Sequence, residues 1–232
     1  MTAATVPSIH RQSTAGPNLA ALAGISTALF LAGLIVGRAM GDATFPSPFD
    51  SSAVILRYFH DNRDAVRVSA FFQFGSAIPL ALYAATASAR LRNLGVRAPG
   101  ATIALVGGTL AAAALSVSAL VGWTLSQPGV LGSPSVVRAL HDLAFATGGP
   151  GHVVPLGLLF LGLAIPALFT GLLPRWLAVG GLVLGVVAEL STLTLLVDGA
   201  AYLLPVARFL GLAWLIVVGV LLPTTRAAVT PG

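Results

Sequence analysis

Residues 101–125 of the chain read ATIALVGGTLAAAALSVSALVGWTL and include no charged side chain. A helix of this length rises about 37 Å at 1.5 Å per residue, whereas the hydrocarbon core of a bilayer is about 30 Å thick. Inside that core only a helix satisfies its own backbone hydrogen bonds over such a run, because no water is there to do so. The stretch therefore predicts a membrane-spanning helix.

Five further apolar runs meet the same length criterion of about 20 residues. They lie near residues 19–40, 66–88, 151–172, 176–197 and 203–223. We therefore expect an all-α integral membrane protein with six transmembrane helices in one domain over residues 19–223. A polar N-terminal tail, residues 1–18, precedes this domain, and a cytoplasmic tail, residues 224–232, follows it.

The composition of the chain is that of a membrane protein. Hydrophobic residues make up 56% of it and charged residues 8%, whereas about 25% of the residues in a soluble domain are charged. The 12 basic residues are all arginines spread between apolar runs, so they indicate topology and not a nucleic-acid partner. The absence of cysteine excludes thiol nucleophiles and cysteine-ligated clusters, and the absence of lysine excludes Schiff-base chemistry.

The arginines also predict which side of the membrane each connection faces. With six spans, one side receives every arginine of the two short connections and of both tails, namely Arg11, Arg90, Arg92, Arg97, Arg175 and Arg226. The positive-inside rule assigns that side to the cytoplasm. Arginine in place of lysine, with much alanine, glycine, leucine and valine, is typical of a high-GC bacterium. The prediction is a multi-pass protein of the bacterial inner membrane with both termini cytoplasmic.

Two segments on the opposite, outer side are expected to be more than loops. Residues 51–62 are short, aromatic and mixed in character, which favours an interfacial helix. Residues 135–147 form an amphipathic pattern in which Arg138, His141, Asp142 and Phe145 share one helical face. The glycines and proline of residues 148–151 end this pattern. The resulting helix is expected either to lie on the membrane or to re-enter it.

A charged side chain within a span is costly, by roughly 2.5–3.5 kcal/mol at the helix centre. Glu189 lies in the fifth predicted span on the face of Gly181 and Gly185, which directs it into the bundle. Arg208 in the sixth span is its expected partner, and Asp198 is the rival partner for Arg208. The two side chains are interpreted either as a structural ion pair or as part of a functional site.

Other polar residues are predicted at a similar depth. Gln73 falls in the outer third of the second span and His152 at the outer start of the fourth, with Arg138, His141 and Asp142 on the outer helix. Together they predict a polar pocket in the outer half of the bundle. Each also has a plainer interpretation, as a solvated helix face, a helix-start residue or a bond to a neighbouring backbone.

The sequence predicts neither a metal nor a cofactor. There are only four histidines, and their positions do not supply two intramembrane pairs for a haem. A zinc site from His141, Asp142 and His152 is an alternative that the spacing does not require. Walker, HExxH and nucleophile-elbow motifs are absent from the sequence.

Three segments carry a resemblance to a known family: 58–62 (YFHDN), 141–151 (HDLAFATGGPG) and 204–209 (LPVARF). Together they resemble the uncharacterised six-helix integral membrane proteins of actinobacteria that are grouped as a domain of unknown function. The resemblance covers nearly the whole chain. It implies a location in the bacterial inner membrane and brings no activity, substrate or catalytic residue with it.

The leading functional hypothesis is that a lipophilic small molecule binds in the outer-half pocket. Its expected polar contacts are Glu189, Arg208, Asp142 and His141, with Gln73, Arg138 and His152 as further contacts. A membrane-embedded isomerase or cyclase is an alternative, with Glu189, Asp142 and His141 as its acid–base groups. A proton-coupled transporter and a structural or accessory subunit are further alternatives. The expected partners are membrane lipid, the small molecule, and a second copy of the chain or another membrane protein, but no nucleic acid.

Overall fold

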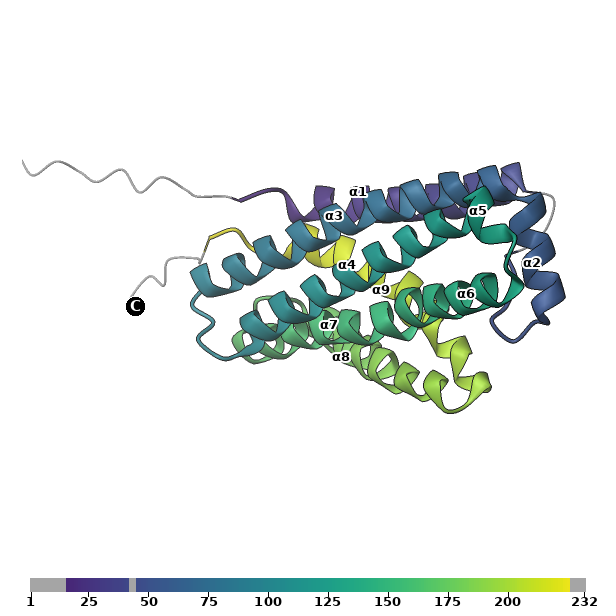
Figure 1. Ribbon diagram of the computed structural model, residues 1–232. Helices are drawn as coiled ribbons and strands as arrows, with labels where there is room; N and C mark the ends of the chain where they lie inside the picture. The colour runs from purple at the N-terminus through teal and green to yellow at the C-terminus, as the bar shows by residue number, and fades with distance from the viewer. Residues whose placement is uncertain (1–15, 42–44, 226–232) are drawn as a thin grey trace, which may run out of the picture.

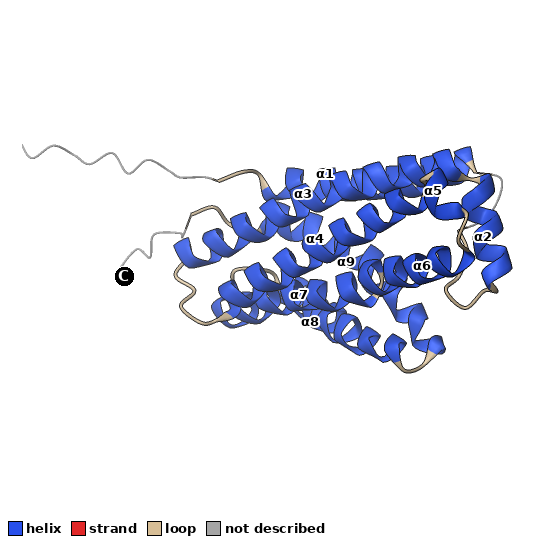
Figure 2. Cartoon of the chain, in the orientation of Figure 1, coloured by secondary structure: helices blue, strands red, loops and turns tan. Residues whose placement is uncertain are grey.

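The computed structural model describes residues 16–41 and 45–225 (Figure 1). Most of the predicted N-terminal tail, with Arg11, and the end of the C-terminal tail, with Arg226, lie outside the described residues. Within them the chain forms helices and loops only (Figure 2). The long helices are α1 (Leu19–Met40), α3 (Arg63–Asn93), α4 (Gly100–Leu125), α7 (Pro150–Thr170), α8 (Arg175–Leu190) and α9 (Leu203–Leu221). The short ones are α2 (Ser52–Asp61), α5 (Pro128–Leu131), α6 (Pro134–Gly148), η1 (Ser191–Leu195) and η2 (Asp198–Tyr202).

The prediction of an all-α membrane protein with six spans is confirmed. Six helical segments are long and apolar enough to cross a bilayer, and they correspond one to one with the six predicted runs. Large apolar side chains also cover the outside of the bundle, among them Phe71, Phe169 and Trp176, which are 72%, 84% and 66% exposed. Such a surface is stable in contact with lipid and not with water.

The six long segments form a closed bundle. Helix α1 packs on α3, α3 on α4, α4 on α7 and α7 on α8, and α9 returns to contact both α8 and α1. Both described chain ends lie at one end of the bundle, called here the termini end, together with the α3–α4 and α7–α8 connections (Figure 1). The opposite end, called the α2 end, carries α2, α5, η1 and η2.

Helix α2 confirms the helix predicted over residues 51–62. Ser51 caps it, because the Ser51 hydroxyl accepts a hydrogen bond from the Val54 amide at 3.4 Å. Its apolar face buries Ile55 and Phe59 in a cluster that also includes Leu125 of α4. The helix therefore closes the α2 end of the bundle.

The helix predicted over residues 135–147 is α6, and its position decides between the two predicted placements. Helices α6 and α7 together run antiparallel to α4 along its whole length: Gly162 contacts Ala104, and the Ser118 hydroxyl donates to the Ala144 carbonyl at 2.9 Å. Helix α6 thus lies inside the bundle, as the first half of a span interrupted at Gly149 (φ −85°, ψ −106°). This span covers Pro134–Thr170, so the predicted start at residue 151 was too late.

Candidate functional site

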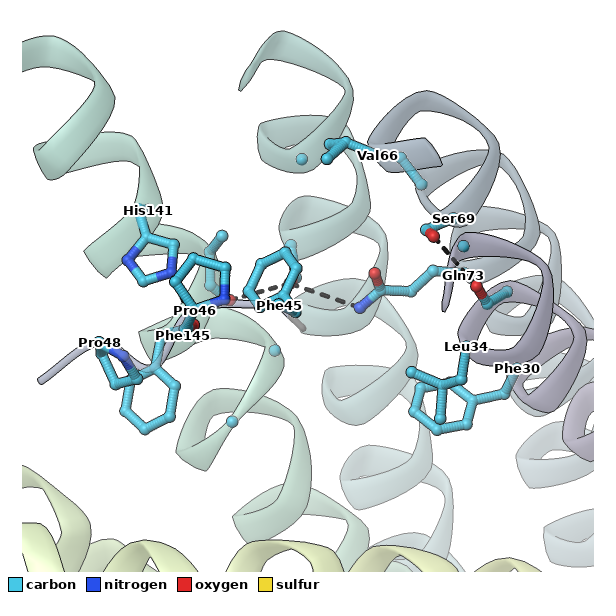
Figure 3. A pocket seen from close by; sticks show the side chains of 18 of the residues that line it. Phe30, Leu34, Phe45, Pro46, Pro48, Val66, Ser69, Gln73, His141 and Phe145 are labelled. Atoms are coloured by element: carbon cyan, nitrogen blue, oxygen red, sulfur yellow. Dashed lines mark hydrogen bonds between the residues drawn. The ribbon is translucent and has the colours of Figure 1, made fainter. Parts of the chain in front are cut away.

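A cavity of about 510 Å³ lies in the half of the bundle nearest the α2 end. Its walls come from α1, α2, α3, α4, α6, η2 and α9, and residues 45–48, which precede α2, lie along it. Most of the lining is apolar, with Phe30, Leu34, Phe45, Val66, Phe145 and Leu204 among its largest side chains. Figure 3 shows how side chains from several elements surround this space.

Three of the predicted site residues line this cavity: Gln73, His141 and Arg208. The Gln73 amide donates to the Ser118 hydroxyl at 3.5 Å, which joins α3 to α4 (Figure 3). Ser69 also lines the cavity, and its hydroxyl donates to the Gly33 carbonyl of α1 at 3.0 Å. These hydrogen bonds hold the helices around the cavity in register, as polar side chains in membrane bundles do.

Arg208 extends from α9 toward the interruption between α6 and α7. One terminal nitrogen, Nη2, donates to the Gly148 carbonyl at the end of α6. The carbon centre of the guanidinium lies 5.4 Å from the centre of the Phe30 ring. Its Nε is buried and has no hydrogen-bond partner. No carboxylate of residues 16–41 and 45–225 lies within 4.0 Å of this guanidinium, so the expected pairing with Glu189 or Asp198 is wrong.

Glu189 occupies a different place from the one predicted. It lies against α7 at Gly157, where a side chain added to that glycine would come within 3.1 Å of the Glu189 Oε1 atom. This oxygen is buried and has no hydrogen-bond partner, and Glu189 does not line the cavity. Arg208 instead reaches Gly148, about nine residues earlier along the α6–α7 segment, and the two side chains therefore do not meet.

The polar face of α6 holds residues 46–50, which precede α2, in place. The Arg138 guanidinium donates to the carbonyls of Pro48 at 2.7 Å and Asp50 at 2.8 Å, and to Asp142 Oδ2 at 2.9 Å. Neither Arg138 nor Asp142 lines the cavity. Arg138 therefore bears on the cavity through residues 48–50, and Asp142 does so through its ion pair with Arg138.

His141 is the most buried member of this face, with 1% of its surface exposed. Its Nε2 lies 3.3 Å from the Pro46 carbonyl, which can only accept, so Nε2 carries the proton in this contact. The imidazole stacks on Phe45 with ring centres 5.7 Å apart and meets the edge of Phe59. The ring therefore packs between residues 45–46 and helix α2. Figure 3 shows Phe45 and Pro46 beside it.

His152 lies deeper than predicted. Its Nδ1 bonds to the Ala111 carbonyl at 2.9 Å, near the middle of α4. Gln73 bonds to Ser118, which is seven residues, or about 10 Å, nearer the α2 end. His152 therefore ties α7 to α4 outside the cavity, because the fourth span begins at Pro134 and not near residue 151.

The zinc alternative finds no support in the arrangement of these side chains. Across the part of the chain that the structure describes, no three histidines, aspartates or glutamates gather closely enough to hold a metal ion. His141 bonds to Pro46 and His152 to Ala111, so the two imidazoles serve separate contacts.

Four polar residues of the cavity were missed by the sequence analysis: Arg38, Tyr58, Ser69 and Ser118. The two serines sit in apolar runs, where a small hydroxyl is a weak signal, and Tyr58 lies on the helix that closes the α2 end. Burial raises the pKa of the Tyr58 hydroxyl, and the nearby positive charge of Arg38 opposes that rise without cancelling it. Tyr58 is therefore neutral at physiological pH.

No protein-family model, curated protein or solved structure matches this chain. The resemblance to the actinobacterial six-helix proteins stays a prediction.

Proposed function

We propose that this multi-pass membrane protein binds a lipophilic small molecule with one polar group in the cavity at the α2 end. The observation that carries the proposal is the cavity itself, because about 510 Å³ is within the 300–1,000 Å³ of typical ligand pockets. Apolar walls with a few convergent polar groups are also what such pockets share. The polar groups are those of Arg208, Gln73, Ser118 and Tyr58.

The geometry gives less support to the enzyme and transporter alternatives. Both place Glu189 at the centre of the chemistry, and Glu189 lies outside the cavity against α7. Of the three predicted acid–base residues only His141 lines the cavity, and its ring is bonded to Pro46 and stacked on Phe45. A substrate in the cavity would therefore meet no free carboxylate from the described residues. An accessory subunit, alone or with a second copy, remains the alternative if the cavity is empty.

Photolabelling tests where a lipophilic molecule binds. A neutral twelve-carbon alcohol carrying a diazirine would be added to membranes, illuminated, and its adducts mapped by peptide sequencing. We expect adducts to concentrate in residues 144–149 and 204–209, which line the cavity from α6 and α9. Adducts confined to the lipid-facing side chains of Phe71, Phe169 and Trp176 would show simple partitioning into lipid and would contradict the proposal.

We propose further that the protein lies in a bacterial inner membrane, with the α2 end outside and the termini end in the cytoplasm. Arg90, Arg92, Arg97 and Arg175 support this orientation, because they lie at the termini end, where the described chain has no acidic side chain. The arginines of the α2 end are instead interspersed with Asp50, Asp61, Asp64 and Asp198.

The lack of cysteine makes the orientation simple to test. Ser52→Cys at the α2 end and Ala98→Cys at the termini end each place one thiol on an exposed position. A membrane-impermeant maleimide should label Ser52→Cys on intact cells and Ala98→Cys only after permeabilisation. The reverse pattern would place the cavity on the cytoplasmic side.

A further inference from the structure

The lining of the cavity carries positive charge without a matching negative charge. Arg208 and Arg38 contribute to it, and no aspartate or glutamate of the described residues does. Arg38 lies at the edge, where one of its nitrogens donates to the Gly41 carbonyl at 3.2 Å. Tyr58 adds no negative charge, because its hydroxyl stays protonated. The charge of the cavity therefore favours an anion.

Arg208 has hydrogen-bonding capacity that the protein does not use. A guanidinium has five N–H groups, and the protein contacts of this one are the Gly148 carbonyl and the face of Phe30. Its buried Nε donates to nothing in the described chain. Buried cations in proteins are normally paired, and the arginine fork fits the two oxygens of a carboxylate or phosphate.

The interruption of the fourth span lies at the same place. Gly148 and Gly149 line the cavity next to Arg208. Helix α7 begins there with Gly149 as its N-cap, and no side chain caps its first turn. The start of this 21-residue helix has a partial positive charge, although the Gly149 and His152 N–H groups already donate to carbonyls and Pro150 has no N–H. Interrupted membrane helices direct such ends toward anionic groups of their ligands.

Gly149 is required at this position for a steric reason. A side chain added there would come within 2.6 Å of the Phe145 carbonyl and 3.3 Å of Leu204. A side chain at this position would therefore displace the Phe145 carbonyl of α6 or the Leu204 side chain of α9.

We propose that the polar group of the ligand is an anion, a carboxylate or a phosphate monoester, bound in the cavity by the Arg208 guanidinium beside Gly148 and Gly149. The inference rests on the proposed function and specifies its ligand class. A purely structural Arg208, which only caps the end of α6 through Gly148, is the competing interpretation. That role would explain the bond of Nη2, but not the lack of a counter-charge in the cavity.

Three probes with twelve carbon atoms each separate the two interpretations: laurate, dodecyl phosphate and dodecanol. Their affinities for the purified protein in a neutral detergent would be measured by native mass spectrometry. We expect at least one of the two anions to bind about tenfold or more tightly than the alcohol, because a charge-assisted bidentate contact is lost with the alcohol. Equal affinity for the alcohol and both anions in the wild-type protein would overturn the inference.

Variants identify the residue responsible. Arg208→Gln should reduce the affinity for the preferred anion to that for the alcohol, and Arg208→Lys should keep part of the preference because it keeps the charge. Glu189→Gln is the matched control, since it alters an intramembrane polar residue outside the cavity and should change no affinity. An unchanged preference for the anion in a folded Arg208→Gln protein would also overturn the inference.

Failure of this inference can be told apart from failure of the proposed function. Alcohol binding without a preference for either anion would leave the lipophilic site standing and remove the anion. Binding of none of the three probes would count against both. Inorganic phosphate, added as a competitor, identifies the source of a phosphate ligand. Displacement of dodecyl phosphate by millimolar phosphate would favour a free ion, and no displacement would favour a lipid headgroup.

Discussion

Gly107→Ala is expected to destabilise the protein by forcing two closely packed helices apart. Gly107 lies where α4 crosses α7 with the two backbones in contact. A Cβ atom there would lie 2.6 Å from the Pro155 carbonyl oxygen and 2.7 Å from the Leu159 backbone nitrogen. Neither atom can rotate away, so the two helices would have to separate. Overpacking of this kind costs about 1–3 kcal/mol, and more when backbone must move.

The same separation would weaken the contacts on either side of Gly107. On one side the His152 imidazole bonds to the Ala111 carbonyl, and on the other Gly162 packs against Ala104. The stability of the detergent-solubilised protein would be followed as the fraction that stays monodisperse after heating. We expect Gly107→Ala to lose this fraction at a temperature several degrees lower than the wild type.

Gly24→Ala is the matched control for this substitution. Gly24 is a glycine within α1, and a Cβ atom added there has no neighbour within 4 Å. Alanine is favoured over glycine within a helix by roughly 0.5–1 kcal/mol. Gly24→Ala should therefore be neutral or slightly stabilising. If the two alanine variants proved equally stable, the close α4–α7 contact would be disproved.

Gly122→Phe is expected to weaken the binding of the lipophilic ligand by about tenfold or more while leaving the fold intact. Gly122 lines the cavity from α4. A Cβ atom added there would approach only one neighbouring atom, the Ala70 Cβ, at 3.8 Å. That is an ordinary van der Waals contact, so a side chain at this position extends into open space. The aromatic ring would occupy room that the ligand needs.

The size of this effect follows from the apolar surface that the ligand could no longer bury. If a portion of the ligand about as large as a phenyl ring can no longer be buried, the binding free energy is weakened by roughly 1.5–3 kcal/mol. Since every 1.4 kcal/mol is a factor of ten, the affinity should fall by about tenfold to a hundredfold. Gly24→Phe adds the same ring to α1 outside the cavity, and it should bind the ligand as the wild type does.

The long helices could be predicted from the sequence because the length of an apolar run is a direct signal for a span. Their ends were less well predicted. Helix α3 begins at Arg63 and continues to Asn93, beyond the apolar run at 66–88. Arginine side chains such as Arg90 can extend along a helix to the membrane surface, so charge at the end of a run does not end the helix.

The start of the fourth span could not be predicted from the length of an apolar run. The glycines at 148 and 149 and Pro150 end the helical pattern, and the sequence before them is amphipathic and not uniformly apolar. Helix α6 nevertheless lies along α4, because Ser118 bonds to its backbone and Val137 packs with Leu125. The contacts that keep α6 inside the bundle are made by α4. The pattern of residues within α6 itself gives no information about such contacts.

For the site, the sequence could predict only the approximate level of some residues along their helices. Gln73, His141 and Arg208 were placed in the outer half of the bundle, and the structure brings these three residues to one cavity. Glu189 was predicted to meet Arg208, but it lies against Gly157 of α7 while Arg208 reaches Gly148. The position along a helix follows from residue number, whereas the neighbour across a helix interface depends on how the helices are arranged. The pairing of Glu189 with Arg208 was wrong for that reason.

The measurement that tests the central claim most directly is mass spectrometry of small molecules extracted from the purified protein. Wild type, Gly122→Phe and Gly24→Phe would be compared from identical preparations. We predict a near-stoichiometric amphiphile, other than bulk phospholipid, in the wild type and in Gly24→Phe, and its loss from Gly122→Phe. If all three preparations carry the same bulk lipids and nothing else, the cavity is not a ligand site and the claim is contradicted.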